Sequence, residues 1–126
     1  MSSTKSSEWK ILALGSDQQL GEEIKQHLHS LGYKNARVVI LQNNQENDQH
    51  LLKLLKEEEW DGVSIGGGIN GHGRNSTREE NTFHWFSRLL NIIHQNASSK
   101  TKIILLRGLS DLEASFQRVL GKDNQK

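Results

Sequence analysis

Four short apolar runs, each followed by a segment whose apolar residues have helical spacing, constrain the fold of this chain more than any other feature. The runs are continuous rather than alternating, which is typical of strands that helices cover on both faces. Strand–helix alternation of this kind implies right-handed crossovers and therefore a parallel sheet. We predict strands over residues 10–14, 36–41, 60–65 and 102–106, in the spatial order 2-1-3-4.

The helical segments complete a three-layer α/β domain of the flavodoxin-like or Rossmann-like kind. Each begins near a residue whose side chain can accept a hydrogen bond from the first helical N–H groups. Gly32 stands where the first helix would end in a left-handed residue. The residues expected to cap the four helices are Ser16 with Gln19, Asp48, Ser76 with Glu79, and Ser110 with Glu113.

The third helical segment has the strongest apolar stripe. Trp85 lies just off that stripe, so an exposed patch around it would favour a role in protein interaction. The residues predicted to face the core are Phe83, Phe86, Leu89, Leu90 and Ile93.

Length and composition limit the class of protein. A chain of 126 residues suits one domain, which we place at 9–120 between disordered tails at 1–8 and 121–126. The net charge of +1 implies no broad basic surface, so we expect neither nucleic-acid nor membrane binding. The absence of cysteine excludes disulfides, thiolate metal sites and thiol nucleophiles. With no signal peptide and no apolar run near 18 residues, we expect a cytoplasmic location.

The glycine-rich segment 66–75 is the strongest candidate for a binding site. In open parallel sheets, ligands bind outside the carboxyl ends of the strands where the strand order reverses, here between the first and third strands. Glycines let the backbone approach a ligand closely, and Arg74 could donate two hydrogen bonds to a phosphate or carboxylate. The predicted ligand-binding residues are Gly15, Ser16, Gly66, Gly67, Gly68, Asn70, Gly71, Gly73, Arg74, Ser76 and Arg107.

Catalytic candidates in this region are Asp17 and His72. Each also has a simpler interpretation, Asp17 as an acid in the first helical turn and His72 as a solvated loop side chain. The glycine segment itself could be a surface loop that only makes turns. Its spacing resembles the dinucleotide fingerprint, but the expected helix begins too late, and His72 stands where a phosphate-binding loop needs Lys. We predict no metal site and name no cofactor.

Two partial resemblances involve these residues. Segments 61–69 and 86–94, with Ala97, Lys102-Ile103 and Asp111, resemble a family of small α/β proteins of bacteria and some eukaryotes that has no assigned activity. This resemblance implies a Rossmann-like fold and covers about half of the chain.

The second resemblance covers the N-terminal segment 10–33. Residues 11–17, 21–25 and 31–33 are similar to the opening of type B ribose-phosphate isomerases. That resemblance implies a sugar-phosphate site, with Gly66 to Gly68 in the place of the phosphate-binding loop. Gln18 stands where that family has a His, and the chain lacks the Cys often used as its base.

The sequence therefore predicts a domain that binds a small anionic ligand at the carboxyl ends of its first and third strands. Two alternatives remain open. One is an enzyme related to sugar-phosphate isomerases, which would need Asp17 or His72 as a titrating group. The other is a non-catalytic interaction domain, for instance a homodimer formed through a sheet edge or the flank around Trp85.

Overall fold

The computed structural model describes residues 6–71 and 79–121 and contains a four-stranded parallel sheet. The strands are β1 (Ile11–Gly15), β2 (Arg37–Ile40), β3 (Gly62–Ile65) and β4 (Lys102–Leu105), in the order β2-β1-β3-β4. The predicted α/β class and strand order are confirmed. Each observed strand lies within one or two residues of its predicted bounds, because the continuous apolar runs are the segments that the helices bury.

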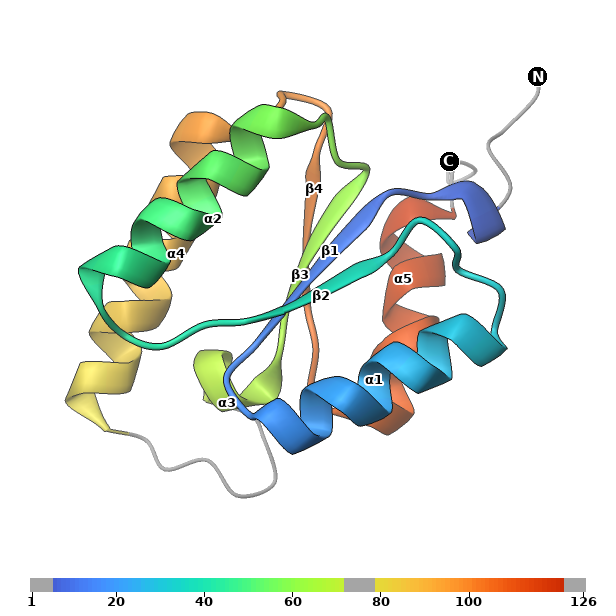
Figure 1. Ribbon diagram of the computed structural model, residues 1–126, viewed down its shortest axis with the longest axis horizontal. Helices are drawn as coiled ribbons and strands as arrows, with labels where there is room; N and C mark the ends of the chain where they lie inside the picture. The colour runs from blue at the N-terminus through green and yellow to red at the C-terminus, as the bar shows by residue number, and fades with distance from the viewer. Residues whose placement is uncertain (1–5, 72–78, 122–126) are drawn as a thin grey trace.

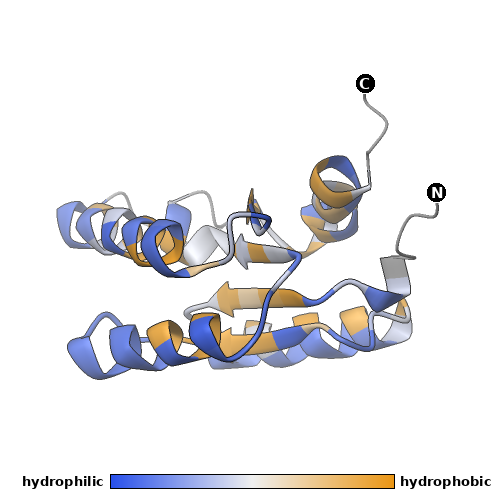
Figure 2. Ribbon diagram, turned by 90° about the horizontal axis from the view of Figure 1, so that it is seen from above, coloured by the Kyte–Doolittle hydropathy of each residue, from blue (hydrophilic) through white to orange (hydrophobic). Residues whose placement is uncertain are grey.

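Helices cover both faces of the sheet (Figure 1). The helices α1 (Gln18–Ser30) and α5 (Leu112–Leu120) lie on one face, and α2 (Gln45–Glu57) and α4 (Glu80–Asn96) lie on the other. Figure 2 shows the strands as mostly hydrophobic, whereas the helices carry hydrophilic residues on their outer sides. Shorter elements are the 3-10 turns η1 (Ser6–Glu8) and η2 (Leu109–Asp111) and the single-turn helix α3 (Gly67–Asn70).

The sheet separates two apolar cores. Successive strand side chains point to opposite faces, so Leu12 and Val63 contribute to the core under α2 and α4, while Ile11 and Ile104 contribute to the core under α1 and α5. The α2/α4 core also contains Leu14, Val39, Leu41, Leu51, Leu54, Leu55, Trp60, Ile65, Ile69, Trp85, Leu89 and Ile93. The α1/α5 core also contains Trp9, Leu28, Tyr33, Leu106, Leu112 and Phe116.

The helix caps differ from those expected. Asp17, not Ser16, caps α1, and its carboxylate accepts hydrogen bonds from the N–H groups of Gln19 at 2.9 Å and Leu20 at 3.2 Å. Asn44, not Asp48, caps α2 by accepting a 2.8 Å bond from the N–H of Asn47. In both cases the capping residue has extended backbone, as an N-cap requires.

The caps of the last two helices also differ. Glu79 is the residue before α4 and makes no capping bond through its side chain, while Ser76 lies outside the described residues. Asp111, the last residue of η2, rather than Ser110 directly precedes α5, and its side chain makes no capping bond.

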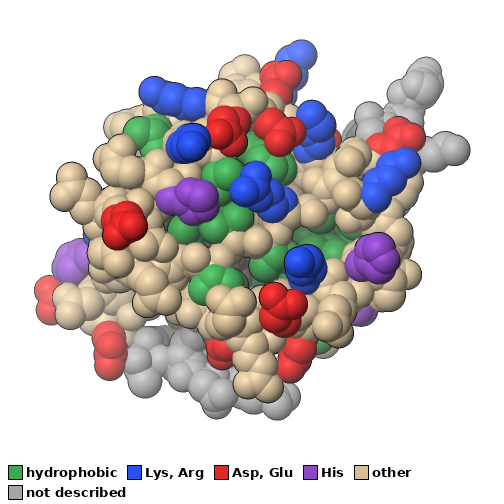
Figure 3. Space-filling view, in the orientation of Figure 1, with side chains coloured by type: hydrophobic (Ala, Val, Ile, Leu, Met, Phe, Trp, Pro, Cys, Tyr) green, Lys and Arg blue, Asp and Glu red, His purple; other side chains and the backbone are tan. Residues whose placement is uncertain are grey.

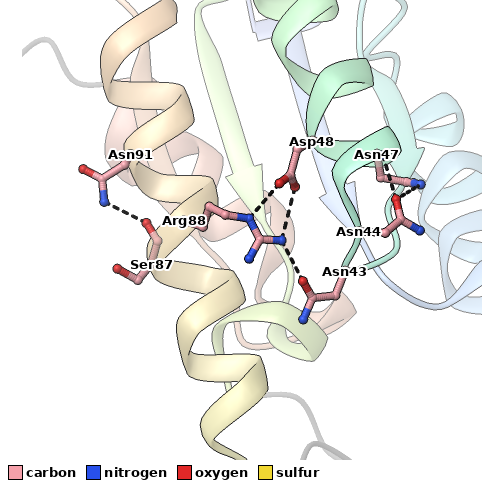
Figure 4. Close-up of polar contacts among 7 residues, drawn as sticks. All are labelled: Asn43, Asn44, Asn47, Asp48, Ser87, Arg88 and Asn91. Atoms are coloured by element: carbon pink, nitrogen blue, oxygen red, sulfur yellow. Dashed lines mark hydrogen bonds and ion pairs between the residues drawn. The ribbon is translucent and has the colours of Figure 1, made fainter.

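Asp48 instead joins two helices on the same face of the sheet (Figure 4). Arg88 of α4 donates from Nε to Asp48 at 2.7 Å and from Nη2 to Asn43 at 2.7 Å. The Asp48 side chain is only 14% exposed, so this charged hydrogen bond is partly shielded from water. The contact fixes the start of α2 against the middle of α4.

The apolar stripe of α4 is rotated from the predicted one. Trp85 is buried, with 6% of its surface exposed, and lies on one face of the helix with Leu89 and Ile93. Phe83, which was expected to face the core, is 65% exposed. The spacing 85, 89, 93 places one side chain on the same face at each turn, and that face is directed at the sheet. Among the described residues, Trp85 is therefore part of the core and not of an exposed patch that would favour protein interaction.

Gly32 follows α1 with a φ of +88°, as predicted from its position after the helix. We expect Gly32→Ala to destabilise the fold by about 1 kcal/mol, because an L side chain disfavours the left-handed region. An added Cβ would meet no atom within 4 Å, so backbone conformation alone sets this effect. Denaturant unfolding measures it.

Gly108 provides the matched control for Gly32. Its surroundings are equally open, but its φ of 171° is extended backbone that any residue adopts. Gly108→Ala should therefore leave the free energy of unfolding unchanged or raise it slightly. Equal destabilisation by the two alanines would contradict the explanation.

The described residues begin before β1, within the segment 1–8 that was predicted as a tail. Residues 6–8 form η1, and Asn35 donates from its amide to the carbonyl of Glu8 at 3.1 Å. Residues 1–5 and 122–126, predicted as tails, lie outside the described residues. Within the described ranges, no helix combines the length and the apolar character needed to cross a membrane.

Candidate functional site

The glycine-rich segment is helical where it leaves the sheet. Residues 66–70 were expected to be loop, but Gly67–Asn70 forms α3 directly after β3. The turn ends at Gly71, whose φ is +88° and whose N–H donates to the carbonyl of Gly67 at 3.0 Å. His72, Gly73, Arg74 and Ser76 lie outside the described residues. The described half of the segment is thus a compact turn at the carboxyl end of β3.

A cavity of about 370 Å³ opens at this end of the sheet, between α1 and the strands. It lies where the strand order reverses, at the carboxyl ends of β1 and β3. Its lining residues are Ala13, Leu14, Gly15, Ser16, Asp17, Leu20, Gly21, Ile24, Val38, Ile40, Ser64, Gly66, Gly67, Gly68, Thr82 and Leu106.

Small side chains leave this space open. Ala13 and Ser64 are opposite each other in the β1–β3 register and point to the α1 face. Gly21 brings α1 close to β2, since an added Cβ there would lie 2.5 Å from Cδ1 of Ile40. The helix is thus held at the edge of the sheet, while Ala13 and Ser64 are too short to fill the floor beside it.

The two loops at the mouth are in direct contact. The N–H of Gly66 donates to the carbonyl of Leu14 at 2.9 Å, which joins the ends of β3 and β1. An added Cβ on Gly68 would lie 2.5 Å from Oγ of Ser16, so α3 approaches the turn before α1 closely. This proximity is what the prediction of a shared site required.

Ser64 is the polar group in the cavity floor that the sequence reasoning missed. The residue is 0% exposed, and its hydroxyl has no hydrogen-bond partner among the residues that the structure describes. Buried hydroxyls are normally paired, because an unpaired one loses its bonds to water without replacement. A serine in the middle of an otherwise apolar strand was the signal that could have identified it.

The predicted ligand-binding residues separate into three groups. Those that line the cavity are Gly15, Ser16, Gly66, Gly67 and Gly68, together with the catalytic candidate Asp17. Asn70, Gly71 and Arg107 are described but do not line it. The remaining residues, His72, Gly73, Arg74 and Ser76, lie outside the described ranges.

Asn70 connects α3 to two strand ends. Its amide nitrogen donates to the carbonyl of Ile65 at 2.9 Å and to the carbonyl of Leu106 at 2.8 Å. These carbonyls lie at the ends of neighbouring strands, so one side chain ties β3, β4 and α3 together. In this position Asn70 holds α3, whose Gly67 and Gly68 line the cavity, against the two strand ends.

Arg107 is directed at the start of α5. Its guanidinium lies 3.8 Å from the carboxylate of Asp111 and is 78% exposed. Asp111 also accepts hydrogen bonds from the hydroxyl of Ser115 at 2.9 Å and from the N–H of Arg107 at 3.3 Å. The bond from Ser115 is the main cause that lowers the pKa of Asp111; partial burial opposes it, and the N–H and charge of Arg107 and the charge of Arg118 add to it.

We expect this network to make stability depend on pH. Because the pKa of Asp111 is lowered in the folded state, the ionised carboxylate stabilises the fold above the pKa of the unfolded chain. That contribution is lost as the pH falls through the folded-state pKa, below about pH 4. Denaturant unfolding of the wild type and Asp111→Asn should differ at pH 7 and converge in acid. A constant difference across this range would contradict the assignment.

The described wall of the cavity carries little charge. Asp17 is the only charged residue among those that line it, and the aliphatic side chains are Ala13, Leu14, Leu20, Ile24, Val38, Ile40 and Leu106. In the described ranges, no three His, Asp or Glu side chains gather closely enough to hold a metal ion. The face in Figure 3 shows basic and acidic side chains interspersed around exposed hydrophobic ones, with no broad patch of one sign.

Comparison with known proteins gives no further guide to the site. No protein-family model, curated protein or solved structure matches this chain. The two family resemblances stay predictions from the sequence.

Proposed function

We propose that this protein binds a small ligand in the cavity between α1 and the carboxyl ends of β1 and β3. The hydroxyl of Ser64 in the cavity floor, which has no hydrogen-bond partner among the described residues, is the observation that carries this proposal. A pre-formed, mostly apolar hollow with a few converging polar groups is the usual form of a small-molecule site. The glycines of α3 allow a ligand close access to the backbone at the mouth.

An anionic group on the ligand, as expected from the sequence, would depend on Arg74 and Ser76. Both follow α3 in the sequence and lie outside the described residues. A cytoplasmic location is part of the same proposal. Isomerase-like catalysis has weaker support, because Asp17 is the only titratable residue in the described lining and its carboxylate already caps α1.

Thermal unfolding with a ligand panel tests the proposal. The panel contains inorganic phosphate, sugar phosphates, nucleotides, flavin mononucleotide and phenol. A ligand at about 100 times its dissociation constant should stabilise the fold by about 2.7 kcal/mol. We expect Ser64→Val, which fills the floor, to abolish the shift. Arg74→Ala should abolish it only if the ligand is anionic.

Ser115 supplies the matched control for Ser64. It is equally buried, but its hydroxyl donates to Asp111, the last residue of η2, and neither residue lines the cavity. Ser115→Ala should destabilise the free protein and keep the ligand shift. Ser64→Ala should leave the free protein as stable as the wild type or more so, because it removes an unpaired buried hydroxyl. Ligand shifts unaffected by Ser64→Val would refute the site.

Self-association through β4 is a second candidate function. Its outer edge pairs with no strand in the described ranges, and Ile103 and Leu105 are 38% and 50% exposed. Apolar edge strands are common sites of strand pairing between chains. Sedimentation velocity of the wild type and Leu105→Lys tests this candidate, which predicts a dimer that the substitution dissociates. A monomer at all concentrations would exclude it.

A further inference from the structure

We infer that the ligand is a compact, uncharged molecule with an apolar body, whose one hydroxyl, carbonyl or amide group binds Ser64 at the cavity floor. This inference rests on the proposed function and specifies the class of ligand. The described wall of the cavity favours an uncharged ligand over the anion expected from the sequence.

The side walls match an apolar body. Leu20 and Ile24 of α1, Val38 and Ile40 of β2, and Leu106, which follows β4, all line the cavity. A ligand that fills this space removes apolar surface from water on both partners, which is favourable without any charge. The volume of about 370 Å³ is at the lower end of the range for small-molecule sites, so the cavity accommodates a compact molecule such as one substituted ring.

The described residues at the mouth of the cavity disfavour the binding of an anion. Helix N-termini bind anions through their free N–H groups and their partial positive charge. At α1 the carboxylate of Asp17 already accepts from the N–H groups of Gln19 and Leu20. The same carboxylate adds a negative charge beside the opening, and no cationic side chain of the described residues lines the cavity to offset it. A phosphate moved inside would lose its water without gaining a partner charge from the described lining.

The floor requires one polar group on the ligand. A serine hydroxyl can both donate and accept, so it pairs with a hydroxyl, a carbonyl or an amide. The neighbours of Ser64 in register are Ala13 of β1 and Ile104 of β4, and neither side chain offers a hydrogen-bonding atom. The ligand itself is then the partner that satisfies the hydroxyl, with its polar group at the inner end.

Phenol and toluene form a matched pair of probes, because they have nearly the same shape and differ by one hydroxyl group. Binding is followed by titration in two-dimensional NMR, with the amide signals of Ala13 and Gly21 as reporters of the cavity. We expect phenol to bind the wild type about 2- to 10-fold more tightly than toluene, the range of a single net hydrogen bond. In Ser64→Ala this preference should disappear while toluene still binds.

Ribose 5-phosphate and inorganic phosphate are the opposing probes. If either binds more tightly than phenol and loses binding in Ser64→Val, the cavity is a ligand site but the inferred ligand class is wrong. Equal binding of phenol and toluene by the wild type would also overturn the role of Ser64. If no probe shifts the Ala13 and Gly21 signals, both this inference and the proposed function fail.

Discussion

Trp85→Ala is expected to lower the free energy of unfolding by about 3–5 kcal/mol, the range measured for large aromatic side chains removed from protein cores. Trp85 belongs to the α2/α4 core and is 6% exposed. Its indole N–H has no partner in the described residues, so the loss comes from apolar burial and from the cavity left behind. Urea unfolding followed by far-ultraviolet circular dichroism measures it.

Phe83→Ala is the control on the same helix. Phe83 stands two residues earlier in α4 and is 65% exposed, so its removal should change stability by no more than about 0.5 kcal/mol. The sequence pattern predicts the reverse order for these two residues. A larger effect at Phe83 than at Trp85 would show that α4 is rotated relative to the structure.

Asn70→Ala is expected to destabilise the protein by about 1–3 kcal/mol, because it leaves partly buried carbonyl groups without their donor. The carbonyl of Ile65 also accepts from the N–H of Leu106, so the carbonyl of Leu106 is affected more strongly. The loss should be greatest near α3. Hydrogen exchange of the Gly71 amide, which is bonded to the Gly67 carbonyl, should accelerate more than exchange in β1.

Asn91→Ala provides the matched substitution. The amide of Asn91 donates to the carbonyl of Ser87 within α4 and is exposed, so water can replace it. We expect a change within about 0.5 kcal/mol and no change in exchange near α3. If both asparagines gave the same small effect, the role assigned to Asn70 in joining the strand ends would be wrong.

The strand order could be predicted because it depends on a pattern that extends along the whole chain. Continuous apolar runs separated by helical spacing admit few topologies. The start of a helix depends on single residues, and several neighbouring side chains are chemically suited to be its N-cap. Asp17 and Ser16 both suit a cap, and only the backbone geometry at the end of β1 decides between them.

The candidate site could be predicted in position but not in chemistry. Gly15, Ser16 and Gly66 to Gly68 line the cavity because they lie at the carboxyl ends of β1 and β3, where the strand order reverses. Ser64 was not predicted, since its significance depends on facing Ala13 across the sheet and on the position of α1. The hollow results from small residues on three elements that are far apart in the sequence.

The two cores divide the tryptophans of the chain between the layers. Trp9 stacks on Tyr33 in the α1/α5 core, with ring centroids 6.2 Å apart, whereas Trp60 and Trp85 belong to the α2/α4 core. Each layer therefore has its own intrinsic fluorophore. A single-tryptophan protein that keeps Trp9 reports on the layer with the cavity, and one that keeps Trp60 reports on the opposite layer. Emission from the two proteins can then distinguish one concerted loss of structure from the separate melting of each layer.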